Sequence, residues 1–365
     1  MRITYIYDEN GPNWEGVEWR CINFMHAINR NGRHKASLLC LDEFINKTDE
    51  AKNRCAHSDI LILHRNIWGK ALSSIQHWMA QDKVVIADFD EAFQLLSPPD
   101  PEYQIFEDHE EMNGSYGKAL SSSRLAQFKW GLQIIGTATV PSPLLAEDWM
   151  AYGQIEIIKD YLELDKFESF RPQQHNTLNL GWKCKSSQLR SPAARGILEA
   201  IREVMMRRQN VGLVICCPEE PTISDLGFPM DRVYSFLADS GKGWLESLAW
   251  IDVGIAPLLT DFDQRVSWRT LLEYMALKIP WIASQGPAFH DLRPYGRLLE
   301  NKAELWQPML LDMVDNYQSI QAEASEAPYL FSLGQTIDEN IHNVIGIYAK
   351  ILNNLQDGII PNSVK

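Results

Sequence analysis

Two arginines and one glutamate form the most distinctive chemical pattern in the sequence. Arg265 and Arg269 lie four residues apart on either side of Ser267, and Glu273 follows one helical turn later. Residues at this spacing share one face of a helix, and two guanidinium groups together suit an anion such as a diphosphate. A carboxylate one turn further along suits a ribose hydroxyl. The pattern therefore indicates a site for a nucleotide diphosphate that carries a sugar.

The elements that must position these residues are typical of a parallel α/β sheet. An apolar run over residues 251–256 predicts a strand, and a polar loop then leads into an amphipathic helix that we expect Ser267 to cap. A second apolar run over residues 280–284 predicts the next strand, which ends just before Gly286. Such sheets bind ligands at the carboxyl ends of their strands, where helix N-termini attract phosphate. Gly286 would allow a ligand to approach the backbone closely.

The same stretch resembles the nucleotide-sugar domain of glycosyltransferase family 4, a group of retaining enzymes with the GT-B fold. The family's two lysines fall at Val266 and Thr270, and its first glutamate falls at Arg265, so the positive charge has moved by one position to Arg265 and Arg269. The residues that carry the resemblance are Asp252, Gly254, Ala256–Pro257–Leu258, Phe262, Ser267, Leu272–Glu273–Tyr274–Met275–Ala276–Leu277, Ile279–Pro280, Ala283–Ser284 and Gly286–Pro287.

The resemblance implies an α/β chain with the GT-B fold, in which two Rossmann-like parallel-sheet domains face a central cleft. Residues 1–160 would form the acceptor-binding domain, residues 161–176 the linker, and residues 177–334 the domain that binds the nucleotide sugar. Residues 335–365 would form a last helix that packs back on the first domain, followed by a tail.

The resemblance also implies a glycosyltransferase that moves a hexose or related sugar from a UDP-, GDP- or ADP-sugar to an acceptor hydroxyl. Transfer would retain the anomeric configuration and need neither a metal ion nor another cofactor. The acceptor would be a carbohydrate, a lipid-linked molecule or a small molecule. Two alternatives stay open: a non-catalytic GT-B scaffold or binding protein, which the altered glutamate and lysine positions favour, and an epimerase that acts on the nucleotide sugar itself.

Candidate donor-site residues follow from the pattern and the resemblance together. Lys183 lies in a basic loop after the first strand of the second half, and with Arg265 and Arg269 it would stabilise the departing diphosphate. Glu273 would bind the ribose. The predicted donor-site residues are Lys183, Arg265, Ser267, Arg269, Thr270, Glu273 and Gly286.

In the first half of the chain, the candidate residues lie at or after the carboxyl ends of predicted strands. A strand over residues 2–7 leads into a turn-rich loop and then a helix over residues 15–31, which Gly32 ends. His64 ends one buried strand and Asp88 ends the next, and we expect both on the catalytic, acceptor-facing side; for His64 a purely structural role in the core stays open. The predicted acceptor-binding residues are Gly11, Asn13, Trp14, Arg20, Arg65 and Asp90.

Asp88 and Asp90 form an Asp-x-Asp sequence, which in an extended segment points both carboxylates the same way. Such a pair suits a metal ion that bridges a diphosphate, but it lies in the half expected to bind the acceptor. We therefore predict no metal site here and expect these acids to face acceptor hydroxyls or to brace the loop. Trp14 and Trp182, both in loops near the predicted edge, are candidates for stacking on sugar rings.

Composition and charge exclude several other classes of protein. The 365 residues suit two domains, the formal net charge of −14 argues against a nucleic-acid partner, and no apolar run is long enough for a membrane span. The six cysteines lack metal-ligand spacing and suit free thiols in a reducing compartment. Because the N-terminus is typical of a first strand, the sequence predicts a cytoplasmic protein, either a monomer or a homodimer.

Overall fold

The computed structural model describes residues 1–9, 14–96, 123–168, 170–217, 223–237 and 241–356. The chain divides into two compact units. The first unit comprises Met1–Tyr161, Arg265–Ser267 and Ile337–Lys365, and the second comprises Leu162–Gln264 and Trp268–Thr336.

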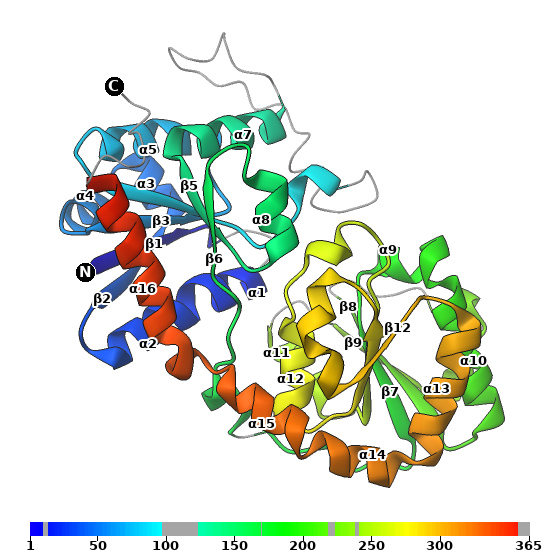
Figure 1. Cartoon of the computed structure of the whole chain (residues 1–365). Coiled ribbons are helices and arrows are strands. Elements are labelled where there is room, and N and C mark those ends of the chain that lie inside the picture. Colours follow the sequence, from blue (N-terminus) through cyan, green and yellow to red (C-terminus); the bar gives the residue numbers. More distant parts are fainter. Residues whose placement is uncertain (10–13, 97–122, 169, 218–222, 238–240, 357–365) are drawn as a thin grey trace. The chain divides into compact units, whose positions relative to one another are not determined.

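The first unit is built on a six-stranded parallel sheet with the order β2-β1-β3-β4-β5-β6 (Figure 1). The order turns back between β1 and β3, and in open α/β sheets the binding crevice lies at the carboxyl ends of the strands at such a turning point. The strands are β1 (Arg2–Tyr7), β2 (Lys35–Cys40), β3 (Ile60–His64), β4 (Val84–Asp88), β5 (Thr137–Val140) and β6 (Gln154–Ile157).

Helices cover both faces of this sheet. On one face α2 (Asn23–Asn31) and α16 (Ile337–Gln356) pack together, and their apolar side chains join those of β1, β3 and β4 in one buried cluster. The opposite face carries α5 (Ala71–Met79) and α7 (Arg124–Ile135) (Figure 1). The other helical segments are α1 (Trp14–Val17), the π-helical turn η1 (Glu18–Ile22), α3 (Leu41–Asn46), α4 (Asp49–Ala56), η2 (Phe93–Leu95) and α8 (Pro143–Trp149).

The second unit repeats the architecture with a six-stranded parallel sheet in the order β12-β11-β10-β7-β8-β9. Its turning point lies between β7 and β10, which are neighbours in the sheet but far apart in the sequence. The strands are β7 (Leu178–Lys183), β8 (Val211–Cys217), β9 (Val233–Leu237), β10 (Val253–Ala256), β11 (Trp281–Ser284) and β12 (Arg297–Leu299).

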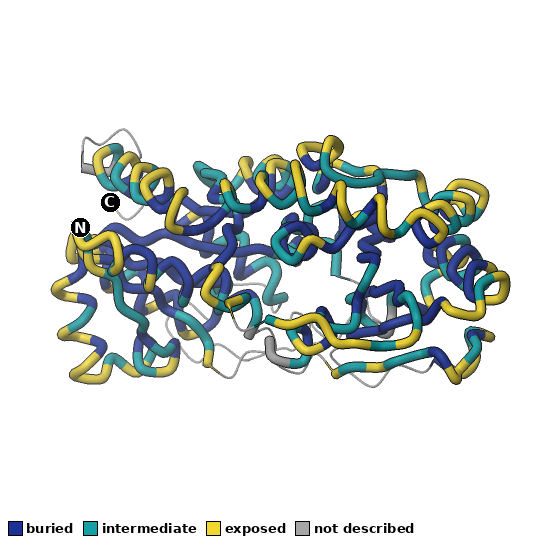
Figure 2. Tube along the Cα trace, turned by 90° about the horizontal axis from the view of Figure 1, so that it is seen from below, coloured by how far each residue is buried: buried dark blue, intermediate teal, exposed yellow. Residues whose placement is uncertain are grey.

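The core of the second unit lies where α10 (Arg195–Arg207) and α13 (Ala303–Asp315) cover one face of the sheet. α11 (Gly241–Leu248) and α12 (Arg269–Ala276) flank the other face (Figure 1). In Figure 2 the buried residues follow the strands, whereas exposed residues follow the outer sides of the helices. The other helical segments are η3 (Leu164–Phe167), α9 (Ser186–Leu189), η4 (Pro192–Ala194), η5 (Ser224–Leu226), η6 (Met230–Arg232), η7 (Asp263–Arg265), η8 (Pro287–Tyr295), α14 (Tyr317–Ala324) and α15 (Ala327–Gly334).

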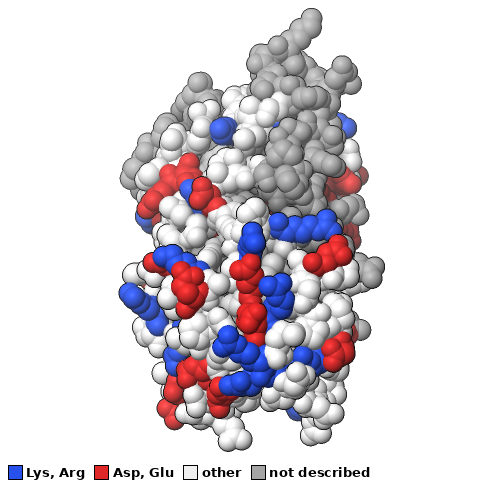
Figure 3. Space-filling model, turned by 90° about the vertical axis from the view of Figure 1, so that its right-hand side faces the viewer, with Lys and Arg blue, Asp and Glu red and all other residues white. Residues whose placement is uncertain are grey.

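The surface around α10 and α13 carries paired charges. Figure 3, which faces this side of the second unit, shows Lys and Arg beside Asp and Glu. Exposed pairs such as Arg208–Asp315 at 2.7 Å and Arg195–Glu199 at 3.0 Å account for part of this pattern, and pairs of this kind contribute little to stability. Among the described helices, none combines the length and the apolar character that a membrane span needs.

Candidate active site

At the carboxyl edge of the first sheet, the Asp88 carboxylate is the centre of a buried network. Arg20 donates to both of its oxygens, with Nε to Oδ1 at 3.1 Å and Nη2 to Oδ2 at 2.6 Å, and the hydroxyl of Thr139 donates to Oδ2 at 2.6 Å. Arg20 also donates to the carbonyl of Ile158 at 2.6 Å and to Asp160 at 3.0 Å. Asp88 is therefore held by side chains from η1 and β5.

The environment of this network keeps Asp88 ionised. Burial raises the pKa of the Asp88 carboxyl, but the adjacent Arg20 guanidinium and the hydrogen bond with His64 outweigh burial and lower the pKa to about 2. Arg20 itself lies on the π-helical turn η1 and is fully buried, so it holds Asp88 in place. This position differs from the acceptor-contacting role that the sequence suggested for Arg20, because its guanidinium is enclosed by protein groups.

His64 pairs with Asp88 across neighbouring strands. The two residues are in register between β3 and β4, and His64 Nδ1 lies 3.1 Å from Asp88 Oδ1. An ionised carboxylate only accepts hydrogen bonds, so Nδ1 is the donor in this pair. His64 is 1% exposed, and Nε2 has no hydrogen-bond partner among the described residues. In this arrangement a carboxylate orients the imidazole, so that the other ring nitrogen could act as a general base.

Arg65 and Asp90 form a second ion pair beside this network. Arg65 has a φ of 65°, in the left-handed region, and its Nε and Nη2 donate to Asp90 Oδ1 at 2.8 and 2.6 Å. Glu91 lies 3.1 Å from the same guanidinium. Asp88 and Asp90 thus pair with different arginines. Within the described residues, no group of three or more His, Cys, Asp or Glu side chains is placed to hold a metal ion.

At the carboxyl edge of the second sheet, Lys183, Trp244 and Glu273 form a stacked cluster. Lys183 ends β7, and its ammonium nitrogen lies 4.8 Å from the centre of the Trp244 ring on α11, within the range of a cation–π contact. The Trp244 indole Nε1 donates to Glu273 Oε2 on α12 at 2.7 Å. Glu273 is 6% exposed and Trp244 4% exposed. The cluster lies at the turning point of the sheet, because β7 is the neighbour of β10.

Gly254 determines how closely α12 lies against the sheet. The ring of Tyr274, the residue after Glu273, packs on Gly254 of β10, and its hydroxyl donates to the carbonyl of Gly181 on β7 at 3.3 Å. A Cβ at Gly254 would lie 2.4 Å from this ring. Glycine at this position therefore brings Glu273 close to the end of β7.

Replacing Gly254 with alanine is expected to lower the free energy of unfolding of the second unit by about 1–3 kcal/mol, because the added methyl group overpacks the Tyr274 ring. Urea denaturation followed by tryptophan fluorescence measures the change. The matched control is Gly346→Ala on α16, where an added Cβ meets nothing within 4 Å. In a helix that exchange should be neutral or stabilising by up to about 1 kcal/mol. Equal losses at both positions would contradict the packing argument.

The two predicted arginines, Arg265 and Arg269, belong to different units. Arg265 belongs to the first unit, where its guanidinium pairs with both oxygens of Asp148 on α8. The Asp148 carboxylate thus already neutralises Arg265. Arg269 begins α12, on the same helix as Glu273. The joint diphosphate clamp of Arg265 and Arg269 therefore stays a prediction, and the structure favours Arg269 as the member that lies beside the Glu273 cluster.

The prediction that Ser267 caps the helix is wrong. Helix α12 begins at Arg269 with Trp268 at its N-cap, and no side chain there makes a cap hydrogen bond. Ser267 belongs to the first unit, and its hydroxyl oxygen is buried without a hydrogen-bond partner among the described residues. Thr270 is half-buried in the first turn of α12.

Gly286 follows β11 and packs closely on the loop after β10. A Cβ at this position would lie 2.2 Å from Gln264 Oε1 and 2.7 Å from Leu258 Cδ1. The φ of Gly286 is −174°, an extended value, so close packing rather than backbone conformation selects glycine here. The same loop is braced by Asp263, whose carboxylate accepts from two backbone N–H groups of the loop and from Gln188 at 3.1 Å.

The four remaining aromatic and loop residues of the prediction are Gly11, Asn13, Trp14 and Trp182. Gly11 and Asn13 lie outside the described residues. Trp14 is the first residue of α1. Trp182 is 1% exposed and belongs to the core that α10 and α13 cover, so the prediction that it stacks on a sugar is wrong. Alternation along β7 turns Trp182 into the core and Lys183 towards α11.

Sequence reasoning missed four residues that hold the predicted ones in place. Trp244 lies 29 positions from Glu273, and Asp148 lies 117 positions from Arg265, so no local spacing connects them. Thr139 and Asp160 lie near the carboxyl ends of β5 and β6. For these two a signal existed, because polar residues at the ends of neighbouring parallel strands meet at one edge of a sheet.

The architecture defines the class of protein. Two parallel six-stranded α/β sheets, each covered by helices on both faces, form the GT-B fold, which the chain shares with solved structures of a sucrose-phosphate synthase and a glycosyltransferase. A scan against protein-family models found no match, and neither did a sequence search of curated proteins.

Solved structures that are similar to nearly the whole chain include the following three. Sucrose-phosphate synthase from Thermosynechococcus elongatus has a TM-score of 0.63 and 12% identity, covering 97% of this chain and 99% of that one. A glycosyltransferase from Rickettsia africae ESF-5 has a TM-score of 0.63 and 11% identity, with the same coverage of 97% and 99%. UDP-GlcNAc 2-epimerase from Neisseria meningitidis, bound to UDP-GlcNAc, has a TM-score of 0.51 and 10% identity, covering 96% and 99%. At these identities the likeness concerns the fold.

Proposed function

We propose that this chain is a glycosyltransferase that moves a sugar from a nucleotide-diphosphate donor to an acceptor hydroxyl. The observation that carries the proposal is the cluster of Lys183, Trp244 and Glu273 at the turning point of the second sheet. In α/β proteins this place in a sheet binds nucleotides. A cation suits the diphosphate and a buried carboxylate suits ribose hydroxyls, and the glycosyltransferases of the same fold support the reaction class.

In the proposed reaction, the bond between the anomeric carbon and the diphosphate oxygen breaks and a bond to the acceptor oxygen forms. Lys183 and Arg269, with the N–H groups at the start of α12, would stabilise the charge that develops on the departing diphosphate. Glu273 would hold the ribose. In the first unit, His64 Nε2 would accept the hydrogen of the acceptor hydroxyl, and Asp88 would fix the orientation of the imidazole.

Several finer features of the proposal rest on the family resemblance of residues 252–287. These are retention of the anomeric configuration, independence from metal ions, a hexose or related sugar, and UDP, GDP or ADP as the carrier. Proton NMR of the product determines its anomeric configuration and so tests retention. Assays with a chelator test independence from metal ions.

Two rival functions each have an observation in their favour. The pairing of Arg265 with Asp148 favours a non-catalytic GT-B protein, because a guanidinium expected at the diphosphate is already neutralised. The likeness to UDP-GlcNAc 2-epimerase favours an enzyme that acts on the nucleotide sugar alone. The transferase needs an acceptor, the epimerase converts the nucleotide sugar without one, and the non-catalytic protein converts nothing, so a turnover assay separates the three.

The test begins with the purified chain and a panel of UDP, GDP and ADP in a thermal-shift assay. We expect one nucleotide to raise the melting temperature, because a ligand at 100 times its Kd adds about 2.7 kcal/mol to stability. The matching nucleotide sugars are then incubated with and without a mixture of sugar and lipid-linked acceptors, and products are identified by mass spectrometry. Donor consumption that requires an acceptor supports the transferase. Conversion of the donor without any acceptor identifies an epimerase, and no response to any nucleotide identifies a scaffold.

A further inference from the structure

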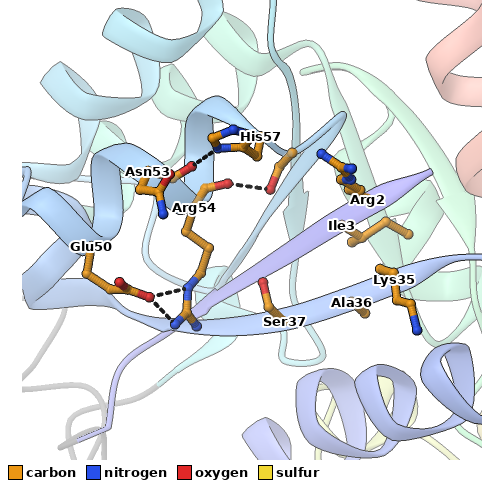
Figure 4. A pocket seen from close by; sticks show the side chains of 10 residues that line it. Arg2, Ile3, Lys35, Ala36, Ser37, Glu50, Asn53, Arg54 and His57 are labelled. Atoms are coloured by element: carbon orange, nitrogen blue, oxygen red, sulfur yellow. Dashed lines mark hydrogen bonds and ion pairs between the residues drawn. The ribbon is translucent and has the colours of Figure 1, made fainter.

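A cavity lies in the first unit, at the edge of the sheet opposite the Asp88 network. Its volume is about 460 Å³, within the range of sites for small molecules. The cavity is lined by the starts of β1 and β2 and by the last two turns of α4 and the segment after it (Figure 4). The lining residues are Arg2, Ile3, Lys35, Ala36, Ser37, Glu50, Asn53, Arg54, His57 and Ser58.

Two of the lining residues, Ser37 and Ser58, belong to a row of hydroxyl groups that the buried Thr4 connects. Thr4 Oγ1 lies 3.0 Å from Ser37 Oγ and 2.7 Å from Ser58 Oγ, and Ser58 donates to the carbonyl of Arg54 at 2.9 Å. Thr4 and Ser58 are buried, whereas Ser37 is half-buried and faces the cavity. Each hydroxyl offers one donor and two acceptor positions, so Ser37 can still bond a polar ligand.

The rim of the cavity carries an excess of positive charge. The lining has three basic residues, Arg2, Lys35 and Arg54, and one acid, Glu50. It therefore has a net charge of +2, in a chain whose net charge is −14. Glu50 pairs with Arg54 on one side of the cavity, and Arg2 and Lys35 lie on the other side (Figure 4).

The two cations on the far side are available to a ligand. The charged groups of Arg2 and Lys35 make no hydrogen bond or ion pair with a described residue, although the backbone N–H of Arg2 donates to Asp59 at 2.7 Å. His57 uses Nδ1 for the carbonyl of Asn53 at 2.7 Å, which leaves Nε2 and the Asn53 amide for other partners. Exposed cations whose charged groups pair with no acid among the described residues, gathered around one cavity, suit an anion.

We propose that this cavity binds a small phosphate monoester that also carries hydroxyl groups, of the sugar-phosphate class. The phosphate would contact Arg2, Lys35 and His57, and the hydroxyls would contact Ser37 and Asn53. Sulfate esters and single carboxylates carry one negative charge, whereas a phosphate monoester carries about −1.5 to −2 at pH 7. A plain sulfate or phosphate ion would leave the hydroxyl groups of the cavity unused. The site lies at the amino edge of the sheet, so it is separate from the strand ends that carry the Asp88 network, and it does not depend on the proposed transferase function.

The test measures the binding of glucose 6-phosphate, inorganic phosphate and unphosphorylated glucose to the full chain by isothermal titration calorimetry at low salt. We expect saturable binding of glucose 6-phosphate, weaker binding of phosphate and none of glucose. Arg2→Gln and Lys35→Gln should each weaken the binding of glucose 6-phosphate about tenfold, the loss of one charge-assisted contact. Lys70→Gln removes an exposed cation of the same unit outside the cavity and should leave the affinity unchanged.

Two further measurements locate the bound ester. Hydrogen exchange should show protection in residues 35–37 and 50–58, and Lys183→Gln should retain the parent affinity because Lys183 lies in the second unit. Absence of saturable binding by any probe overturns the proposal. The same holds if Lys183→Gln abolishes binding while Arg2→Gln and Lys35→Gln retain it, or if phosphate binds as tightly as the ester.

Discussion

Replacing Asp88 with alanine is expected to lower the free energy of unfolding of the first unit by about 3–5 kcal/mol, because Arg20 would stay buried without its main counter-ion. Asp88 accepts two hydrogen bonds from Arg20 and one from Thr139, and it pairs with His64. All of these partners are buried, so water cannot replace the lost carboxylate. Urea denaturation at pH 7, combined with hydrogen exchange of the β3 and β4 amides, measures the change.

The pH dependence of the free energy of unfolding is a second test of the role of Asp88. The pKa of Asp88 falls from its ordinary value of 3.8 to about 2 in the folded chain. A carboxyl whose pKa is lower in the folded state stabilises the fold above its unfolded pKa, and this contribution is lost as the pH falls through the folded pKa. The parent chain should therefore lose stability between about pH 4 and pH 2 more steeply than Asp88→Ala.

The matched control for Asp88 is Asp338→Ala. Asp338 pairs with Arg30 through hydrogen bonds of 2.9 to 3.1 Å, but both side chains are exposed. An exposed pair of this kind is worth about 0–1 kcal/mol. If Asp88→Ala costs no more than Asp338→Ala, the Arg20 network does not hold the edge of the sheet together.

Replacing Glu273 with glutamine is expected to weaken nucleotide binding by about 10- to 100-fold, because a hydrogen bond to a charged group is worth about 1.5–3 kcal/mol. Glutamine keeps an oxygen that can accept from the Trp244 indole, so the contact between α11 and α12 should persist. The change thus removes the charge offered to the ribose hydroxyls while it preserves the packing. Calorimetric titration with the nucleotide selected in the thermal-shift panel measures the affinity.

Two companion variants separate a role in binding from a role in folding. Trp244→Phe removes the indole donor but keeps an aromatic ring beside Lys183, and it should lower stability more than Glu273→Gln does. Glu304→Gln alters an exposed acid on α13 and should change neither quantity. A parent-like nucleotide affinity in Glu273→Gln would falsify the ribose role of Glu273.

The sheets were predictable from sequence because their central strands are continuous apolar runs. Ile60–His64 and Val211–Cys217 are buried along their entire length, and such runs bounded by turns predict strands of a parallel sheet. The edge strands β9 and β12 lacked this signal. Val233–Leu237 is only partly buried, and Arg297–Leu299 spans three half-buried residues. An edge strand has one neighbour and so needs less apolar surface.

The site was predictable in part, for reasons that particular residues make clear. Lys183, His64 and Asp88 lie at strand ends, so counting along each strand placed them at the carboxyl edges. The environment of Arg20 was not predictable, because the π-helical turn η1 rotates it into the core beneath Asp88. The partner of Arg265 was not predictable from the sequence either. Asp148 precedes it by 117 positions, and only the folded chain brings the two together.

The first unit is built from segments far apart in the sequence, and this affects the order in which the two units fold during synthesis. Residues of α16 complete the hydrophobic cluster that β1, β3 and β4 begin, so that cluster stays open to water until the ribosome has released the segment around Ile351. The second unit lies ahead of α16, in the segments Leu162–Gln264 and Trp268–Thr336, which only Arg265–Ser267 separate. Nascent domains usually fold from the N-terminus onwards, but here the later-translated unit can close first. The earlier-translated unit can complete its hydrophobic cluster only after α16 has been made.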